Sequence, residues 1–141
     1  MDILCIGTEL EPFVQSRPAY WNRLIKQIRG TYKGKLTYTS NWEEFDRVPF
    51  WKQLDYIGID AYFPLSEAQT PTAEELIAGW QPWKTKIIDL YTAMQQPVLF
   101  PEFGYRSMDY TVKKPRLVDG KEERPNMESQ ANCKKSVFLE F

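Results

Sequence analysis

Four short apolar runs, separated by segments with helical spacing, constrain the fold more than any other feature of this sequence. The runs cover residues 2–7, 35–40, 56–62 and 97–103. The first has no alternating polar residues, a pattern typical of a strand buried on both faces of a parallel sheet. Because helical segments alternate with these runs from one end to the other, the sequence predicts an α/β fold with a parallel sheet.

The segments between the runs predict helices. One should start at Pro18 and stop at Gly30, because its apolar residues recur at spacings of three and four. A short helix is expected within 43–54, a long one over 74–94 with Pro82 kinking or restarting it, and a last one over 126–141. No linker or shift in composition divides the chain, so a single domain over residues 1–141 is the simplest prediction.

Two glutamates, Glu9 and Glu102, each stand just past an apolar run. Acidic residues are disfavoured in buried strands, so a carboxylate at a strand's end indicates a group delivered to the edge of the sheet. In parallel α/β sheets the carboxyl edge is where ligands bind. The two residues therefore form a candidate catalytic carboxylate pair; the alternative is that they pair with Arg or Lys at strand ends.

The amino-acid composition limits the catalytic groups and partners that the chain can have. The 141 residues contain no histidine, which excludes His-based triads and His metal sites and leaves carboxylates as the leading acid–base groups. A net charge of −1 argues against a nucleic-acid partner, and no apolar run suits a membrane span. Cys5 and Cys133 do not suggest a disulfide framework. No signal peptide is recognised at Met1, which permits a cytoplasmic location without establishing one.

Several motifs, in order along the chain, resemble the glycoside hydrolase family 113 β-mannanases. They lie in the stretches Gly7-Thr8-Glu9-Leu10, Gly34 to Trp42, Leu54 to Leu65 and Leu99 to Ser107, with a weaker similarity in Glu128-Ser129-Gln130-Ala131. The resemblance implies a (β/α)8 barrel and a retaining mechanism without metal or cofactor. It makes Glu9 the acid/base at the end of strand four and Glu102 the nucleophile at the end of strand seven.

The resemblance also implies the substrate, a β-1,4-mannan or related β-linked polysaccharide, and residue chemistry suggests which side chains meet it. Thr8 stands where the wider clan usually has an Asn that contacts the sugar. Tyr62 is a candidate hydrogen-bond donor to Glu102. An amide beside an indole suits the hydroxyls and C–H faces of a sugar, so Asn41 and Trp42 are candidate binding residues; a turn Asn followed by a packing Trp is the alternative.

Two departures from the pattern bear on activity. Pro101 stands before the proposed nucleophile, where Thr is expected, and Pro removes a backbone N–H from the sheet. Counterparts of strands one to three and eight are absent, so we expect a partial barrel of about strands four to seven, with little turnover by itself and with self-association through open edges as one outcome. A clan relative cutting another β-glycan, a non-catalytic carbohydrate-binding remnant and an unfolded fragment are the alternative readings.

Overall fold

The computed structural model describes residues 2–116 and 124–141, which form two compact units. Unit 1 consists of Met1–Ala61 and Ile87–Glu102, and unit 2 of Tyr62–Lys86 and Phe103–Phe141. Each unit is described separately below. The single domain over residues 1–141 stays a prediction.

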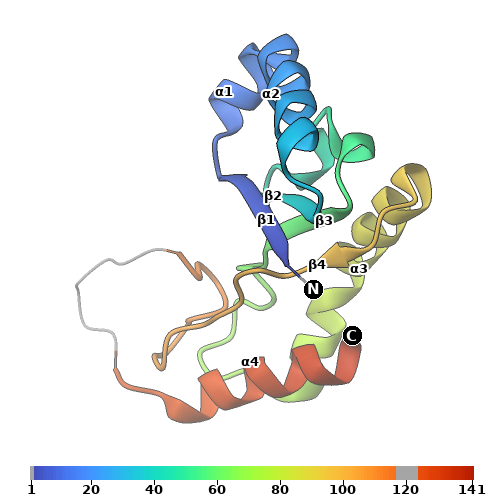
Figure 1. Ribbon diagram of the computed structural model, residues 1–141. Coiled ribbons are helices and arrows are strands. Elements are labelled where there is room, and N and C mark those ends of the chain that lie inside the picture. The colour runs from blue at the N-terminus through green and yellow to red at the C-terminus, as the bar shows by residue number, and fades with distance from the viewer. Residues whose placement is uncertain (1, 117–123) are drawn as a thin grey trace. The chain divides into compact units, whose positions relative to one another are not determined.

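Unit 1 contains a four-stranded parallel sheet. Its strands are β1 (Ile3–Thr8), β2 (Lys35–Asn41), β3 (Tyr56–Asp60) and β4 (Val98–Leu99). They lie side by side in the order β1-β2-β3-β4, and every neighbouring pair is parallel (Figure 1). The four strands predicted from the apolar runs, and their parallel arrangement, are therefore confirmed.

Helices and 3₁₀ turns lie between the strands, because parallel neighbours must be joined by crossover connections. The helical elements are α1 (Glu11–Ser16), α2 (Pro18–Thr31), the 3₁₀ turns η1 (Phe45–Arg47) and η2 (Trp51–Gln53), α3 (Ala73–Met94) and α4 (Met127–Glu140). The sequence analysis missed α1, which is only six residues long. The short helix expected within 43–54 is two separate 3₁₀ turns. The segment from about Met108 to Pro125 is polar and contains prolines, which predicts a loop; residues 117–123 of this segment lie outside the described residues.

The prediction that the first strand is buried on both faces is wrong. Ile3 is 40% exposed and Leu4 is 39% exposed. Among the described residues β1 pairs with β2 alone, so it is an edge strand of this sheet. The apolar run correctly predicts the strand, but burial of both faces also requires neighbours on each side, and this sheet gives β1 only one.

The fourth strand is shorter than its predicted range because prolines flank it. Pro97 and Pro101 have no N–H, so neither can donate to a sheet ladder. The pairing with β3 nevertheless continues through acceptors, since Ile57 N donates to Pro97 O and Ala61 N donates to Glu102 O, each at 2.9 Å. The backbone of Glu102 is therefore held beside the end of β3.

Aromatic side chains form the core between α2 and one face of the sheet. Trp21 of α2 stacks on Phe50 with ring centroids 5.1 Å apart and meets Tyr38 of β2 edge-on at 5.5 Å. Each of these three side chains is at most 1% exposed. Side chains alternate along a strand, so Thr37, Thr39 and Asn41 point to the opposite face of β2.

A carboxylate ties the amino end of β2 to its surroundings. Asp55 accepts a hydrogen bond from Leu36 N (2.8 Å) and pairs with Arg29 (2.7 Å) and Lys35 (3.1 Å). Burial of Asp55 opposes ionisation, but these donors outweigh it and lower the pKa of the carboxyl below its ordinary value. Asp55 is thus a structural anchor at the edge opposite to the strand ends that carry the candidate site.

Unit 2 is built around the first half of α3 and α4. Trp80 is fully buried and its indole N–H donates to Ser136 Oγ of α4 at 3.1 Å, while Lys84 pairs with Glu140 at 2.7 Å. The buried residues of α4 are Ser129, Cys133 and Ser136. Phe138, a large apolar residue of the same helix, is 82% exposed. Small side chains face the unit because they let α4 approach the indole of Trp80 closely.

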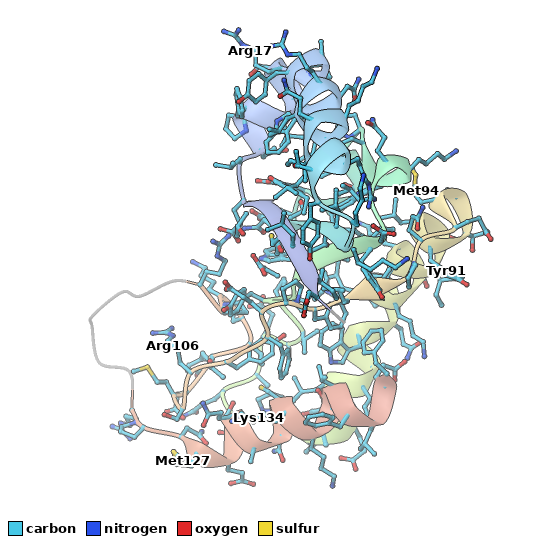
Figure 2. All side chains as sticks on the ribbon, viewed as in Figure 1. Arg17, Tyr91, Met94, Arg106, Met127 and Lys134 are labelled. Carbon is cyan, nitrogen blue, oxygen red and sulfur yellow. The ribbon has the colours of Figure 1, made fainter. Side chains whose placement is uncertain are left out.

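Pro82 lies inside α3, which does not restart there. Proline in a helix interior costs about 3 kcal/mol. Apolar side chains buried on either side of it, among them Leu76 and Leu90, offset that cost. The helix ends near Tyr91 and Met94, where Figure 2 shows both side chains on its last turns. Gly79 faces the backbone of Leu65 so closely that a Cβ would overlap the carbonyl group.

Candidate active site

The candidate site lies in unit 1, at the carboxyl ends of the parallel strands. Glu9 directly follows β1, Asn41 ends β2 and Glu102 follows β4. Because all four strands are parallel, these ends share one edge of the sheet, the edge where α/β folds place ligands. The structure brings two of these residues into direct contact: Asn41 Nδ2 donates to Glu9 Oε1 at 3.2 Å.

Glu9 has a backbone conformation that L-residues rarely adopt, with φ of 50°. Such a conformation costs a non-glycine residue about 1–2 kcal/mol and is often found at functional sites. Two other described non-glycine residues have positive φ, and one of them, Gln95, follows the end of α3, where this conformation is a common helix stop. No helix end explains the conformation of Glu9.

Hydrogen bonds to β2 hold the strained backbone at position 9. Glu9 N donates to Thr39 O at 2.9 Å, and Leu10 N donates to the Tyr38 hydroxyl oxygen at 2.7 Å. Burial raises the pKa of Tyr38 to about 12, so its hydroxyl stays protonated at neutral pH. The turn that carries the Glu9 carboxyl is therefore attached to β2 through two consecutive backbone N–H groups.

Asn41 is 5% exposed and its amide is used at both ends. Its Oδ1 accepts from Glu43 N at 3.1 Å, and its backbone oxygen accepts from Glu44 N at 3.0 Å. This is the side-chain-capped turn for which asparagine is favoured. The turn reading from the sequence is thus correct for Asn41, and the same amide also reaches Glu9.

Further carboxylates surround Glu9. Burial, together with a hydrogen bond to Glu11 and the negative charge of Glu11, raises the pKa of Glu44 to about 7. Arg47 pairs with Glu11 and opposes this shift. Glu9 also adds to the negative potential at Glu44. Glu44, whose carboxyl interacts electrostatically with Glu9, therefore takes up a proton as the pH falls through about 7.

The sequence analysis did not identify Tyr38, Thr39, Glu11 or Glu44 as neighbours of Glu9. Parallel pairing of the first two strands was predicted, and it puts residues near the end of β2 beside the end of β1. The register, however, shifts between Cys5 and Thr8, so the pattern alone does not give the partner of Glu9.

The other predicted site residues differ in how far they are exposed. Thr8 and Glu102 are exposed, and Trp42 is half-buried in the turn after β2. Tyr62 belongs to unit 2, where it lies beside Gly104. The substrate-binding roles of Thr8, Trp42 and Tyr62 and the nucleophile role of Glu102 stay predictions.

No group of three or more His, Cys, Asp or Glu side chains suited to a metal ion occurs within residues 2–116 and 124–141. Both cysteines are free thiols; Cys5 is exposed and Cys133 is buried. None of the helices in the described part of the chain has the length and apolar character needed to cross a membrane.

A comparison with models of known protein families shows to which family the chain belongs. Residues 1–141 match the family model described as Glycoside Hydrolase Family 113. The chain belongs to glycoside hydrolase family 113. No curated protein matches its sequence.

Solved structures of this family have the same fold. The chain superposes on the GH113 β-mannanase AaManA from Alicyclobacillus acidocaldarius, solved in complex with ManMIm, with a TM-score of 0.80 and 23% identity over 99% of this chain and 40% of that one. Two structures of GH113 β-1,4-mannanase, one of them a complex, give TM-scores of 0.81 at 25% identity, over 98% of this chain and 40% of theirs.

The chain thus spans about 40% of the length of the family 113 structures that it matches. The predicted family and the predicted fold, a partial (β/α)8 barrel, are both confirmed.

Proposed function

We propose that this family 113 chain carries the acid/base and nucleophile of a retaining glycoside hydrolase that cleaves β-1,4-mannan or a related β-linked polysaccharide. The observation that carries the proposal is Glu9, a carboxylate held in a left-handed backbone conformation at the carboxyl end of a parallel strand. Glu102 follows another strand of the same sheet. Membership of family 113 and the structural similarity to β-1,4-mannanases of that family support the substrate class.

The chemistry is a double displacement. The Glu102 carboxylate attacks the anomeric carbon while Glu9 gives its proton to the glycosidic oxygen, so the C–O bond breaks and a glycosyl ester forms. Glu9, now ionised, takes a proton from water, and the resulting hydroxide attacks the same carbon and releases Glu102. This mechanism requires the two carboxyl groups about 5–5.5 Å apart in the complete site.

A side chain of the neighbouring strand holds the Glu9 carboxyl, because Asn41 Nδ2 donates to Glu9 Oε1 at 3.2 Å. We assign Thr8, Asn41, Trp42 and Tyr62 to substrate binding, with Trp42 offering an aromatic face to the sugar ring.

The deciding experiment measures reducing-sugar release from β-1,4-mannan by the purified chain, with its oligomeric state recorded. Glu102→Ala is compared with Glu74→Ala, which removes an exposed carboxylate from the first turn of α3. Activity that Glu102→Ala abolishes and Glu74→Ala keeps would support the proposal. Activity that survives Glu102→Ala would overturn the assignment of the nucleophile.

Since the chain covers part of a barrel, low turnover is expected, and a trapping experiment adds sensitivity. A 2-deoxy-2-fluoro mannosyl donor with a good leaving group should label the peptide that contains Glu102, as read by mass spectrometry. Labelling elsewhere, or a product of inverted configuration, would contradict a retaining mechanism through Glu102.

A non-catalytic carbohydrate-binding function is the second candidate, because Asn41 and Trp42 adjoin each other in the turn after β2. It predicts binding of mannohexaose by calorimetry that Glu102→Ala leaves unchanged, with no product formed. Binding that falls with Trp42→Ala, together with labelling of Glu102, would instead favour the enzyme.

A further inference from the structure

We infer that Asn41 is a positioning residue that orients the carboxyl group of Glu9 for proton transfer to the glycosidic oxygen. The inference deepens the proposed function and rests on it for the acid/base role of Glu9. The geometry that carries it is the bond from Asn41 Nδ2 to Glu9 Oε1 at 3.2 Å.

The orientation of the Asn41 amide is fixed independently of Glu9. A backbone N–H can only donate, so the end of the amide that meets Glu43 N at 3.1 Å must be the carbonyl oxygen. The NH₂ end is therefore the one that faces Glu9. The usual uncertainty about which end of an asparagine is nitrogen does not arise here.

The frame around this amide is rigid. Asn41 is the last residue of β2 and is 5% exposed, and its backbone oxygen accepts from Glu44 N at 3.0 Å. On the other side, Glu9 N is held to Thr39 O at 2.9 Å. The backbones that carry donor and acceptor are thus both attached to β2, which limits the movement of position 9 relative to Asn41.

A chemical consequence follows from the donor. An amide N–H cannot accept a proton in a hydrogen bond, so Oε1 of Glu9 serves as the acceptor in this contact in both protonation states. Holding the carboxyl group in one orientation preorganises its proton transfer, because fewer rotamers of the side chain then compete with the one that faces the glycosidic oxygen.

The variant Asn41→Asp distinguishes the contact of Asn41 with Glu9 from its hydrogen bond in the turn. An aspartate keeps an oxygen for Glu43 N, so the turn is retained, but it replaces the donor to Glu9 with a second carboxylate. Asn41→Ala removes both contacts. Ser40→Ala is the matched control, since Ser40 is the preceding residue of β2 and its hydroxyl donates to the backbone oxygen of Asn41 at 3.4 Å.

The first test uses the 141-residue chain and needs no turnover. Side-chain amide and carboxyl signals are followed by NMR over pH, with Glu9→Gln to assign the response, since Glu11, Glu44, Arg47 and Tyr38 also lie nearby. The Asn41 amide signals should follow the titration of Glu9 in the wild type and in Glu102→Gln, and should lose that response in Glu9→Gln. An Asn41 amide that does not respond to Glu9 would overturn the inference.

In Asn41→Asp the Glu9 carboxyl signal should change at a pH higher by about one unit or more than in the wild type, because two carboxylates then face each other. Ser40→Ala should leave it within about 0.2 units, since the control keeps the Asn41 amide. An unchanged midpoint in Asn41→Asp would refute the contact. These outcomes do not depend on mannan cleavage, so they remain decisive if the proposed function fails.

Where mannan is cleaved, kinetics give a second reading. Asn41→Asp and Asn41→Ala should lower kcat about 10- to 100-fold and move the alkaline limb of the pH profile upward, while Ser40→Ala does neither. A rise in KM alone, with kcat and the alkaline limb unmoved, would show that Asn41 only binds substrate and would overturn the positioning role.

Discussion

Replacing Glu9 by glycine should give a more stable protein than replacing it by alanine, against the usual order. Both substitutions remove the carboxyl group and its bond to Asn41, so these losses cancel in the comparison. The remaining difference is the backbone, which holds position 9 at a φ of 50°. Glycine adopts this conformation without a steric penalty, whereas alanine does not.

The magnitude follows from two opposing effects. An L-residue in the left-handed region costs about 1–2 kcal/mol, and glycine loses about 0.5–1 kcal/mol through the greater freedom of its unfolded chain. The glycine variant should therefore be about 1 kcal/mol more stable than the alanine variant, which corresponds to roughly 2–4 °C in Tm for a domain of this size.

The assay is urea unfolding followed by tryptophan fluorescence, with Trp21 and Trp51 reporting from the core of unit 1. Position 8 supplies the matched control, because Thr8 lies in β1 and is not among the positive-φ residues. There glycine should be less stable than alanine by about 0.5–1 kcal/mol. Position 95 is a positive control, since Gln95 has a φ of 58°.

An alanine variant at position 9 that equals or exceeds the glycine variant would refute the reasoning, provided that position 95 shows the glycine preference. The backbone at Glu9 would then carry no strain. If the glycine variant is the more stable, the native glutamate is kept at a cost to stability, which is expected of a residue retained for its side chain.

Three further predictions concern stability. Glu44→Gln should stabilise the chain at pH 8 and flatten the pH dependence of its stability. The pKa of Glu44 is raised to about 7, so the folded state binds more protons than the unfolded state between about pH 4.5 and 7. Wild-type stability therefore falls as pH rises through that range, and the glutamine variant should lack this fall. Asp55→Asn should cost about 1–2 kcal/mol at pH 7, measured by urea unfolding, and the difference from wild type should shrink below about pH 4, because a lowered pKa gives stability that is lost on acidification. Gly79→Ala should destabilise the chain by about 1–3 kcal/mol, because the added Cβ would overlap a neighbouring backbone. Gly30 has open space around it, so Gly30→Ala should be neutral or stabilise by up to about 1 kcal/mol. Equal effects of the two substitutions in thermal unfolding would contradict this packing argument.

Much of the fold could be predicted because its signals are local. Apolar runs located the four strands, and the spacing of Trp21 and Ile25 located α2 within a residue of its end. The short helix α1 and the buried small-residue face of α4 could not be found this way. In α4 the residue that faces the unit is Ser136 rather than Phe138, because the indole of Trp80 needs a close hydrogen-bonding partner.

The sequence by itself determined that the chain is a parallel α/β protein of the family 113 type, with Glu9 and Glu102 past the ends of strands. These properties depend on residue type and spacing along the chain. The tertiary structure alone decided that β1 is an exposed edge, that Glu9 has a positive φ and that the Asn41 amide faces its carboxyl group. Register and side-chain direction bring residues 9 and 41 together, and both arise only when separate strands pair, since a strand records its own periodicity but not its neighbour's register.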